Sequence, residues 1–281
     1  MIQTKLKGMG VALITPFKED ESVDYDALMR MVDYLLQNNA DFLCVLGTTA
    51  ETPTLTEEEK KTIKKMVIDR VNGRIPILLG VGGNNTRAIV ETLKNDDFTG
   101  VDAILSVVPY YNKPSQEGIY QHYKAIAEAT ELPIVLYNVP GRTGVNMTAE
   151  TTLRIARDFK NVVAIKEASG NITQMDDIIK NKPENFNVIS GDDGITFPLI
   201  TLGAVGVISV IGNAFPREFS SPESGTRCDA VLLQISPGKP CRRRMTKVIR
   251  SWRLCRPLPL HLHDESAAYP FRHGYRPSRR C

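Results

Sequence analysis

The sequence predicts a (β/α)8 TIM barrel over residues 1–220, and two observations predict it. Short apolar runs alternate with amphipathic helical stretches, which is the pattern of βαβ units. Eight such units in about 200–250 residues are typical of a closed barrel of parallel strands. The main alternative is a doubly wound open sheet, which normally binds a nucleotide through a glycine fingerprint after its first strand. The first apolar run here leads into Thr15, Pro16 and Phe17, which is no such fingerprint.

The expected strands are apolar and rich in β-branched residues, as buried strands are. In chain order they are residues 11–15, 42–46, 75–79, 103–108, 134–137, 162–165, 187–190 and 205–210. Helices are expected between them. The first helix has one apolar face, formed at a 3.6-residue spacing by Leu28, Met31, Val32, Leu35 and Leu36.

Helix starts are marked by capping residues. Thr56 and Glu59 form a capping box at the start of the second helix. Further helical stretches are expected to start near Thr86, Ser115, Thr148, Ile172 and Ile195. Each of these starts follows one of the predicted strands, as the alternation of a (β/α)8 barrel requires.

The pattern ends near Ser220, and residues 221–281 have a different composition. Residues 1–220 carry a net charge of −6 and residues 221–281 carry +9, with four of the five cysteines. One interpretation of this Arg-, Pro- and Cys-rich tail is a membrane- or nucleic-acid-binding segment. The composition favours the other, a segment out of frame or fused to the barrel. We expect it to replace the eighth helix and any helices after it.

Several functional classes are excluded for the barrel. Its acidic balance argues against nucleic acid as a partner. The chain has no apolar run of about 18 residues for a membrane span and no signal-peptide pattern at its start, so we expect a cytoplasmic protein.

His122 is the one histidine before residue 221, expected as a partly exposed helix residue, and no metal cluster is predicted. Residues 80–83 are no P-loop. The barrel resembles a cofactor-free enzyme.

Lys166 is the most informative residue. It ends the apolar strand at residues 162–165, where burial disfavours its charged ammonium form. A neutral amine is a nucleophile, and lysines that form Schiff bases use this property. The alternative is a lysine that reaches past the strand end to water. Active sites of (β/α)8 barrels lie at the carboxyl ends of the strands, which favours the nucleophile.

Other strand ends carry polar and aromatic residues. The segment at residues 47–51 can form an anion-binding nest or a plain turn into a helix, and residues 109–112 an aromatic lid. Tyr137 is expected to face inward one strand from Lys166, where a phenol can relay protons. Arg142 can clamp a carboxylate or form a surface ion pair.

These residues resemble the dihydrodipicolinate synthase family, within the pyruvate-dependent class I aldolase superfamily. The resemblance covers about residues 1–219. It is carried by six strings in order: GTTAE (47–51), PYYNKPSQEG (109–118), YNVPGRTG (137–144), IKEASGN (165–171), SGDD (190–193) and GVISV (206–210). Each string alone is a weak signal, and together at this spacing they are highly specific.

The resemblance implies a role for each matching residue. Lys166 forms a Schiff base with pyruvate, while Tyr137 and Thr48 relay protons. Tyr111 completes the relay by reaching into the site of a neighbouring subunit, which implies a dimer or tetramer. Thr48 and Thr49 bind the pyruvate carboxylate, and Arg142 binds the carboxylate of L-aspartate 4-semialdehyde. Gly191 and Ile208 contribute backbone to the pyruvate pocket.

The implied reaction condenses pyruvate with L-aspartate 4-semialdehyde to 4-hydroxy-tetrahydrodipicolinate, in lysine and diaminopimelate synthesis. N-acetylneuraminate lyases and 2-keto-3-deoxy sugar acid aldolases share the fold and the lysine and stay as alternatives. A chain impaired by its tail, or a non-catalytic barrel fragment with a binding tail, is a further alternative.

The sequence departs from the family pattern in two places within the barrel. Ala50 replaces the usual glycine of GTTGE, in a turn where a positive φ would favour glycine. Lys60 and Ala88 stand where lysine-inhibited members use a histidine and a glutamate. We therefore predict weak or no feedback inhibition by lysine.

Overall fold

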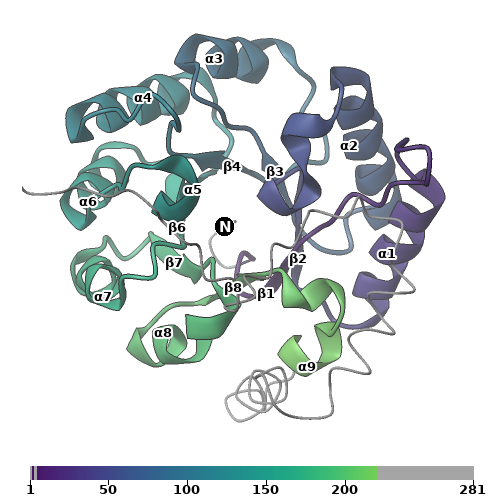
Figure 1. Ribbon diagram of the computed structural model, residues 1–281. Helices are drawn as coiled ribbons and strands as arrows, with labels where there is room; N and C mark the ends of the chain where they lie inside the picture. The colour runs from purple at the N-terminus through teal and green to yellow at the C-terminus, as the bar shows by residue number, and fades with distance from the viewer. Residues whose placement is uncertain (1, 3–4, 221–281) are drawn as a thin grey trace, which may run out of the picture.

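The chain forms a closed barrel of eight parallel strands (Figure 1). The computed structural model describes residue 2 and residues 5–220. β1 pairs with β2 on one side and with β8 on the other, which closes the sheet. The predicted (β/α)8 barrel is confirmed. The strands are β1 (Gly8–Ala12), β2 (Phe42–Val45), β3 (Ile77–Gly80), β4 (Ala103–Val107), β5 (Ile134–Asn138), β6 (Val162–Glu167), β7 (Asn187–Ser190) and β8 (Gly206–Ser209).

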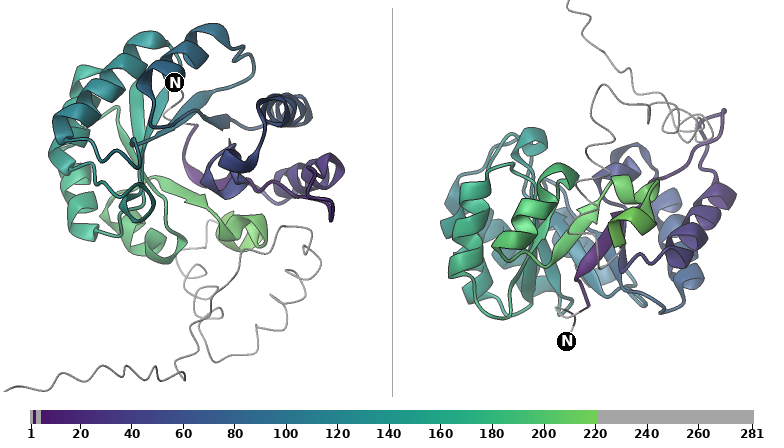
Figure 2. Two further views of the ribbon diagram at one scale, coloured as in Figure 1. Left: turned by 45° about the horizontal axis from the view of Figure 1, so that its top comes forward. Right: turned by 90° about the horizontal axis from the view of Figure 1, so that it is seen from below.

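Helices surround the sheet, as Figures 1 and 2 show. The longer ones are α1 (Tyr25–Gln37), α2 (Glu57–Val71), α3 (Thr86–Asn95), α4 (Gln116–Ala129), α6 (Ala149–Asp158), α7 (Ile172–Asn181) and α8 (Thr196–Leu202). The capping box of Thr56 and Glu59 is present at the start of α2. α5 (Pro140–Thr143) is a single turn after β5. No helix within residues 5–220 has the length and apolar character needed to cross a bilayer.

β1 begins three residues earlier than the sequence predicts, at Gly8 instead of Val11. The glycine-rich start of this strand has weak strand propensity, but it pairs with β8 over four residues. The two backbones approach so closely that a Cβ on Gly206 would lie 2.1 Å from the carbonyl oxygen of Gly8. Tertiary pairing therefore decides the start of β1.

The inside of the barrel is filled by one cluster of buried side chains, and a larger cluster lies between the strands and the helices. Strand alternation separates the two faces, because successive side chains of a strand point to opposite sides. Cys44 is fully buried in the inner cluster, as predicted. The inner cluster also contains Tyr137 and Ile208.

The expectation for His122 is wrong. This histidine lies on α4 with only 3% of its surface exposed. Its Nδ1 atom is 2.8 Å from Oγ1 of Thr86, and its Nε2 atom is buried without a hydrogen-bond partner among the described residues. The 3.6-residue spacing from Ile119 and Tyr123 to Ile126 places His122 beside the buried face of the helix.

The last described element is the short helix α9 (Pro216–Ser220), which follows β8. Phe219 of α9 is buried and belongs to the larger cluster. The expectation that a basic tail replaces the eighth helix concerns residues 221–281, which lie outside the described residues.

Candidate active site

Lys166 and Tyr137 lie side by side at the ends of β6 and β5. The strand register pairs them directly, and both are buried, with 5% and 6% of their surfaces exposed. The Nζ atom of Lys166 is 4.5 Å from the centroid of the Tyr137 ring. A buried amine and a phenol this close can exchange protons during covalent chemistry.

Gly191 gives Lys166 its space. The N–H of Gly191 donates to the carbonyl oxygen of Glu167 at 2.8 Å, which brings the end of β7 close to β6. A Cβ at position 191 would lie 2.8 Å from Cβ of Ala168 and 3.1 Å from Cε of Lys166. Glycine is needed here because residues 166–168, at the end of β6, approach too closely for any side chain.

Thr48 and Thr49 begin a turn of 3₁₀ helix, Thr48–Ala50, after β2. The residues with positive φ in this segment are Leu46 and Glu51. Ala50 is not among them, so the alanine in place of glycine causes no backbone strain. The carbonyl oxygen of Ala50 accepts a 2.8 Å hydrogen bond from Oγ1 of buried Thr15, which ties the turn to the segment after β1.

A cavity of about 290 Å³ opens at this end of the barrel. Thr48 lines it from the end of β2, and Tyr137 and Arg142 line it from the end of β5. Arg142 lies on α5 with its side chain exposed, and within residues 5–220 no ion pair holds its guanidinium. The surface ion pair considered for Arg142 is therefore absent from this part of the chain. A guanidinium that lines a cavity without an ion pair in residues 5–220 suits an anionic substrate.

Comparison with known proteins gives one family. The description "Dihydrodipicolinate synthetase family" belongs to the family model that matches residues 5–221. The chain belongs to this family.

Similar proteins are named 4-hydroxy-tetrahydrodipicolinate synthase or dihydrodipicolinate synthase. The chain is 87% identical over 220 residues to 4-hydroxy-tetrahydrodipicolinate synthase of Phocaeicola vulgatus, covering 78% of this chain and 74% of that protein. Against the enzyme of that name from Parabacteroides distasonis the identity is 82%, with the same coverage. The solved dihydrodipicolinate synthase of Aquifex aeolicus is 37% identical, with a TM-score of 0.79, over 91% of this chain and 92% of that chain. A structure described as the first monomeric dihydrodipicolinate synthase variant is 38% identical, with a TM-score of 0.80, over 89% of each chain.

Tyr111 lies apart from the other residues that the family resemblance names. Its side chain is 89% exposed, and its backbone has a positive φ of 72°. The neighbouring Tyr110, and not Tyr111, lines the cavity. The expected role of Tyr111 in a second subunit stays a prediction. Ile208 of β8 is buried inside the barrel, where its backbone is expected to border the pyruvate pocket.

A second cavity of about 260 Å³ adjoins the first. Lys60 lines both cavities, and Ala88 lines the second. The amine of Lys60 pairs with the Glu57 carboxylate at 2.7 Å. Weak or absent feedback inhibition by lysine, which Lys60 and Ala88 predict in place of a histidine and a glutamate, stays a prediction.

Glu167 is the residue that sequence reasoning missed. The string IKEASGN contains it, but the sequence assigns it no role. It is fully buried on β6, and burial raises the pKa of its carboxyl group above the ordinary value. One signal was available: a charged residue next to an inward-facing lysine must point to the opposite face, where the helices cover the strand. A carboxylate there needs hydrogen-bond donors.

Proposed function

We propose that the barrel condenses pyruvate with L-aspartate 4-semialdehyde through a Schiff base on Lys166. The overall reaction is the 4-hydroxy-tetrahydrodipicolinate synthase step of lysine and diaminopimelate synthesis, the activity for which its relatives are named. The observation that carries the proposed mechanism is the buried pair of Lys166 and Tyr137, together with a cavity that Tyr137 and Arg142 line. No cofactor is needed for it.

Covalent catalysis divides the reaction into easier steps. The amine of Lys166 adds to the ketone carbon of pyruvate, and loss of water gives the imine. Loss of a methyl proton then gives an enamine, whose carbon attacks the aldehyde carbon of the second substrate. The former aldehyde oxygen takes up a proton and becomes the hydroxyl group. The amino group of the second substrate finally displaces Lys166, which closes the ring and restores the free amine.

Tyr137 is the group placed to move protons between these steps. Its ring lies against the amine of Lys166, and Thr48 lines the same cavity. The first N–H groups of a helical turn have no acceptor within the turn. Those of the turn at Thr48 and Thr49 can therefore donate to the pyruvate carboxylate, and their hydroxyls can add to this.

Arg142 is proposed to bind the carboxylate of the semialdehyde. A guanidinium can hold a carboxylate with two parallel hydrogen bonds, which orients the substrate as well as attracting it. Because Arg142 and Lys166 stand at the ends of neighbouring strands, the aldehyde carbon can meet the enamine between them.

Self-association is proposed as well, because the family resemblance gives Tyr111 a role in a neighbouring subunit. The exposure of Tyr111 supports this. We further propose that residues 1–220 are the catalytic domain, in a cytoplasmic protein.

Trapping the imine tests the mechanism. The full chain is incubated with pyruvate and borohydride, which reduces an imine to a stable adduct, and the adduct is located by peptide mass mapping. We expect one pyruvate adduct on Lys166 and none in Lys166→Ala. Lys182→Ala, which removes a half-buried lysine at the end of α7, is the control and should keep the adduct. A folded wild-type chain without an adduct on Lys166 would overturn the proposed mechanism.

A further inference from the structure

Glu167 is an unusual group to find buried. Its side chain has no exposed surface. Strand alternation places it opposite Lys166, on the face that the helices cover. A buried carboxylate costs free energy, and well-packed apolar residues of similar volume are often at least as stable. Stability alone therefore does not explain why a carboxylate occupies this position.

The carboxylate is held by three donors. The side-chain amide of Asn138 lies 3.1 and 3.2 Å from its two oxygens. The N–H of Ser169 donates to it at 2.9 Å, and the side-chain amide of Gln174 at 3.2 Å. Asn138 and Glu167 are also a register pair of β5 and β6, one residue beyond Tyr137 and Lys166. The network is thus attached directly behind the reacting pair.

The same network reaches the loop that carries Arg142. Asn138 accepts from the N–H of Met147 at 3.0 Å and donates to Oδ1 of Asn146 at 2.9 Å. Asn146 in turn donates to Oε1 of Gln174 at 2.8 Å. Residues 139–147 therefore leave β5 and return to the same buried carboxylate and amides.

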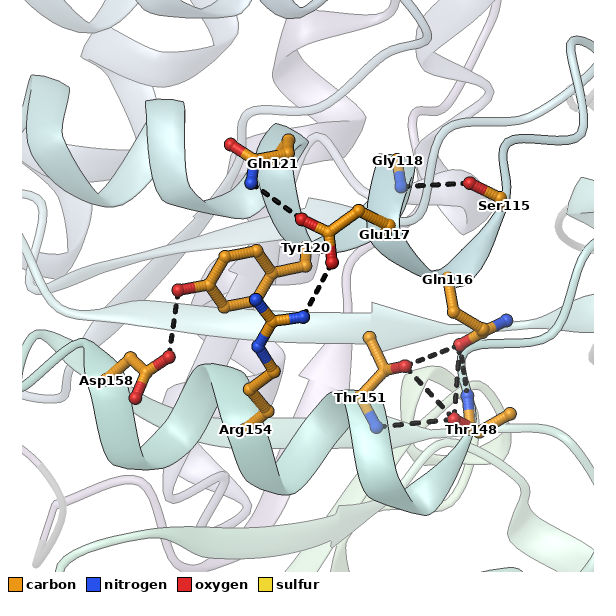
Figure 3. Close-up of polar contacts among 10 residues, drawn as sticks. All are labelled: Ser115, Gln116, Glu117, Gly118, Tyr120, Gln121, Thr148, Thr151, Arg154 and Asp158. Carbon is orange, nitrogen blue, oxygen red and sulfur yellow. Dashed lines mark hydrogen bonds and ion pairs between the residues drawn. The ribbon is translucent and has the colours of Figure 1, made fainter.

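A second anchor holds the far end of this loop. Gln116, at the start of α4, donates to the carbonyl oxygen of Asn146 at 2.8 Å. The side-chain oxygen Oε1 of Gln116 accepts from the N–H of Thr148 at 3.0 Å and from Oγ1 of Thr151 at 2.7 Å, both at the start of α6 (Figure 3). The loop is fixed against α4 and α6 on one side and against Glu167 on the other.

We propose that Glu167 is a positioning residue that holds the Arg142 loop at a fixed place relative to Lys166 and Tyr137. This inference rests on the proposed function, because it assigns Arg142 to the second substrate. Imine formation with pyruvate depends on Lys166 and its neighbours in the barrel. Loss of the Glu167 carboxylate should therefore affect the aldehyde step and leave the imine step in place.

Glu167→Gln is the direct test. It keeps the volume, but its amide nitrogen must face one of three donors, so the network cannot remain intact. We expect trapping with pyruvate to persist. A displacement of about 1 Å can cost about 100-fold in rate, and we expect kcat/KM for the semialdehyde to fall on the order of 10–100-fold, with KM for pyruvate little changed.

The control is Glu117→Gln on α4. Glu117 accepts from Gln121 and Arg154 on the exposed surface shown in Figure 3, outside the Asn138 network. The same chemical change there should leave pyruvate trapping and kcat/KM for the semialdehyde unchanged. A rescue variant exchanges the partners: Asn138→Asp with Glu167→Gln restores an amide donor facing a carboxylate. It should recover part of the activity with the semialdehyde.

Asn146→Ala guards against a Glu167 variant that fails to fold. Asn146 is only half-buried. Its replacement by alanine removes the hydrogen bonds that join the Arg142 loop to Asn138 and Gln174, and leaves Glu167 in place. It should reproduce the selective loss. The proposal is overturned if both variants behave like Glu117→Gln, or if pyruvate trapping falls in parallel with the semialdehyde reaction. Absence of an adduct in the wild-type chain would instead reject the proposed function itself.

Discussion

At the scale of single residues, close approach to Lys166 decides what its neighbours can be. The amine packs on the Tyr137 ring, and the backbone at Gly191 crosses next to its side-chain carbons. Both neighbours come from adjacent strands, so the geometry is built on rigid elements. A reacting amine is most effective when its surroundings allow few other positions.

Gly191→Ala should therefore damage the imine step. The added Cβ would lie 3.1 Å from Cε of Lys166 and 2.8 Å from Cβ of Ala168, so the lysine or the strand has to move. We expect the rate of adduct formation with pyruvate and borohydride to fall by about tenfold or more. Gly83→Ala, whose new Cβ would meet nothing nearer than 3.9 Å, is the matched control. Equal trapping rates in the two variants would contradict this account.

At the scale of elements, the strand-end turns are held by side chains that lie outside the turns. The turn at Thr48–Ala50 depends on the hydroxyl of Thr15, which follows β1. The loop around Arg142 depends on Asn138, which ends β5. Each turn is therefore positioned in part by residues outside it, within the closed barrel.

Thr15→Val tests the first of these links. Valine keeps the shape but removes the hydroxyl, which leaves the carbonyl oxygen of Ala50 without this donor. An unsatisfied buried acceptor costs about 1–3 kcal/mol, so we expect a lower free energy of unfolding in urea and a higher KM for pyruvate. Thr54→Val removes an exposed hydroxyl that bonds the Glu51 carbonyl at 2.9 Å, and should change both quantities little. A Thr15 variant that matches Thr54→Val would refute the link.

At the scale of the whole molecule, the layer between the strands and the helices contains polar groups that depend on pH. Burial lowers the pKa of His122 from 6.5 to about 4 and raises the pKa of Glu167. The folded chain therefore resists protonation at His122, whereas it takes up a proton at Glu167 more readily than the unfolded chain does. The two groups have opposite effects on stability as the pH falls.

The contribution of His122 can be isolated with His122→Asn. Below pH 6.5 the unfolded chain binds a proton that the folded chain does not, so stability falls with pH until about pH 4. Between about pH 7.5 and 5 the wild type should lose about 2 kcal/mol through this residue. The free energy of unfolding in urea is measured for both chains at both pH values. The difference in free energy of unfolding between the wild type and His122→Asn should shrink or reverse at the lower pH. A difference independent of pH would show that His122 does not act in this way.

The sequence by itself determined the barrel and singled out Lys166, at the end of a buried strand, as the candidate nucleophile. The alternation of apolar runs with capped helices depends on local spacing, which can be read directly from the amino-acid sequence. For the same reason Lys166 and Tyr137 could be paired in advance, since strand order and alternation place them side by side.

Only the tertiary structure decided the start of β1, the burial of His122 and the partners of Glu167. Each of these depends on contacts between segments far apart in the chain. Gly8 becomes a strand residue because β8 lies beside it, and Glu167 can stay buried because Asn138, Ser169 and Gln174 supply its donors. Local propensity is a weak guide at such positions, because the free energy that settles them comes from packing and hydrogen bonds that exist only in the closed barrel.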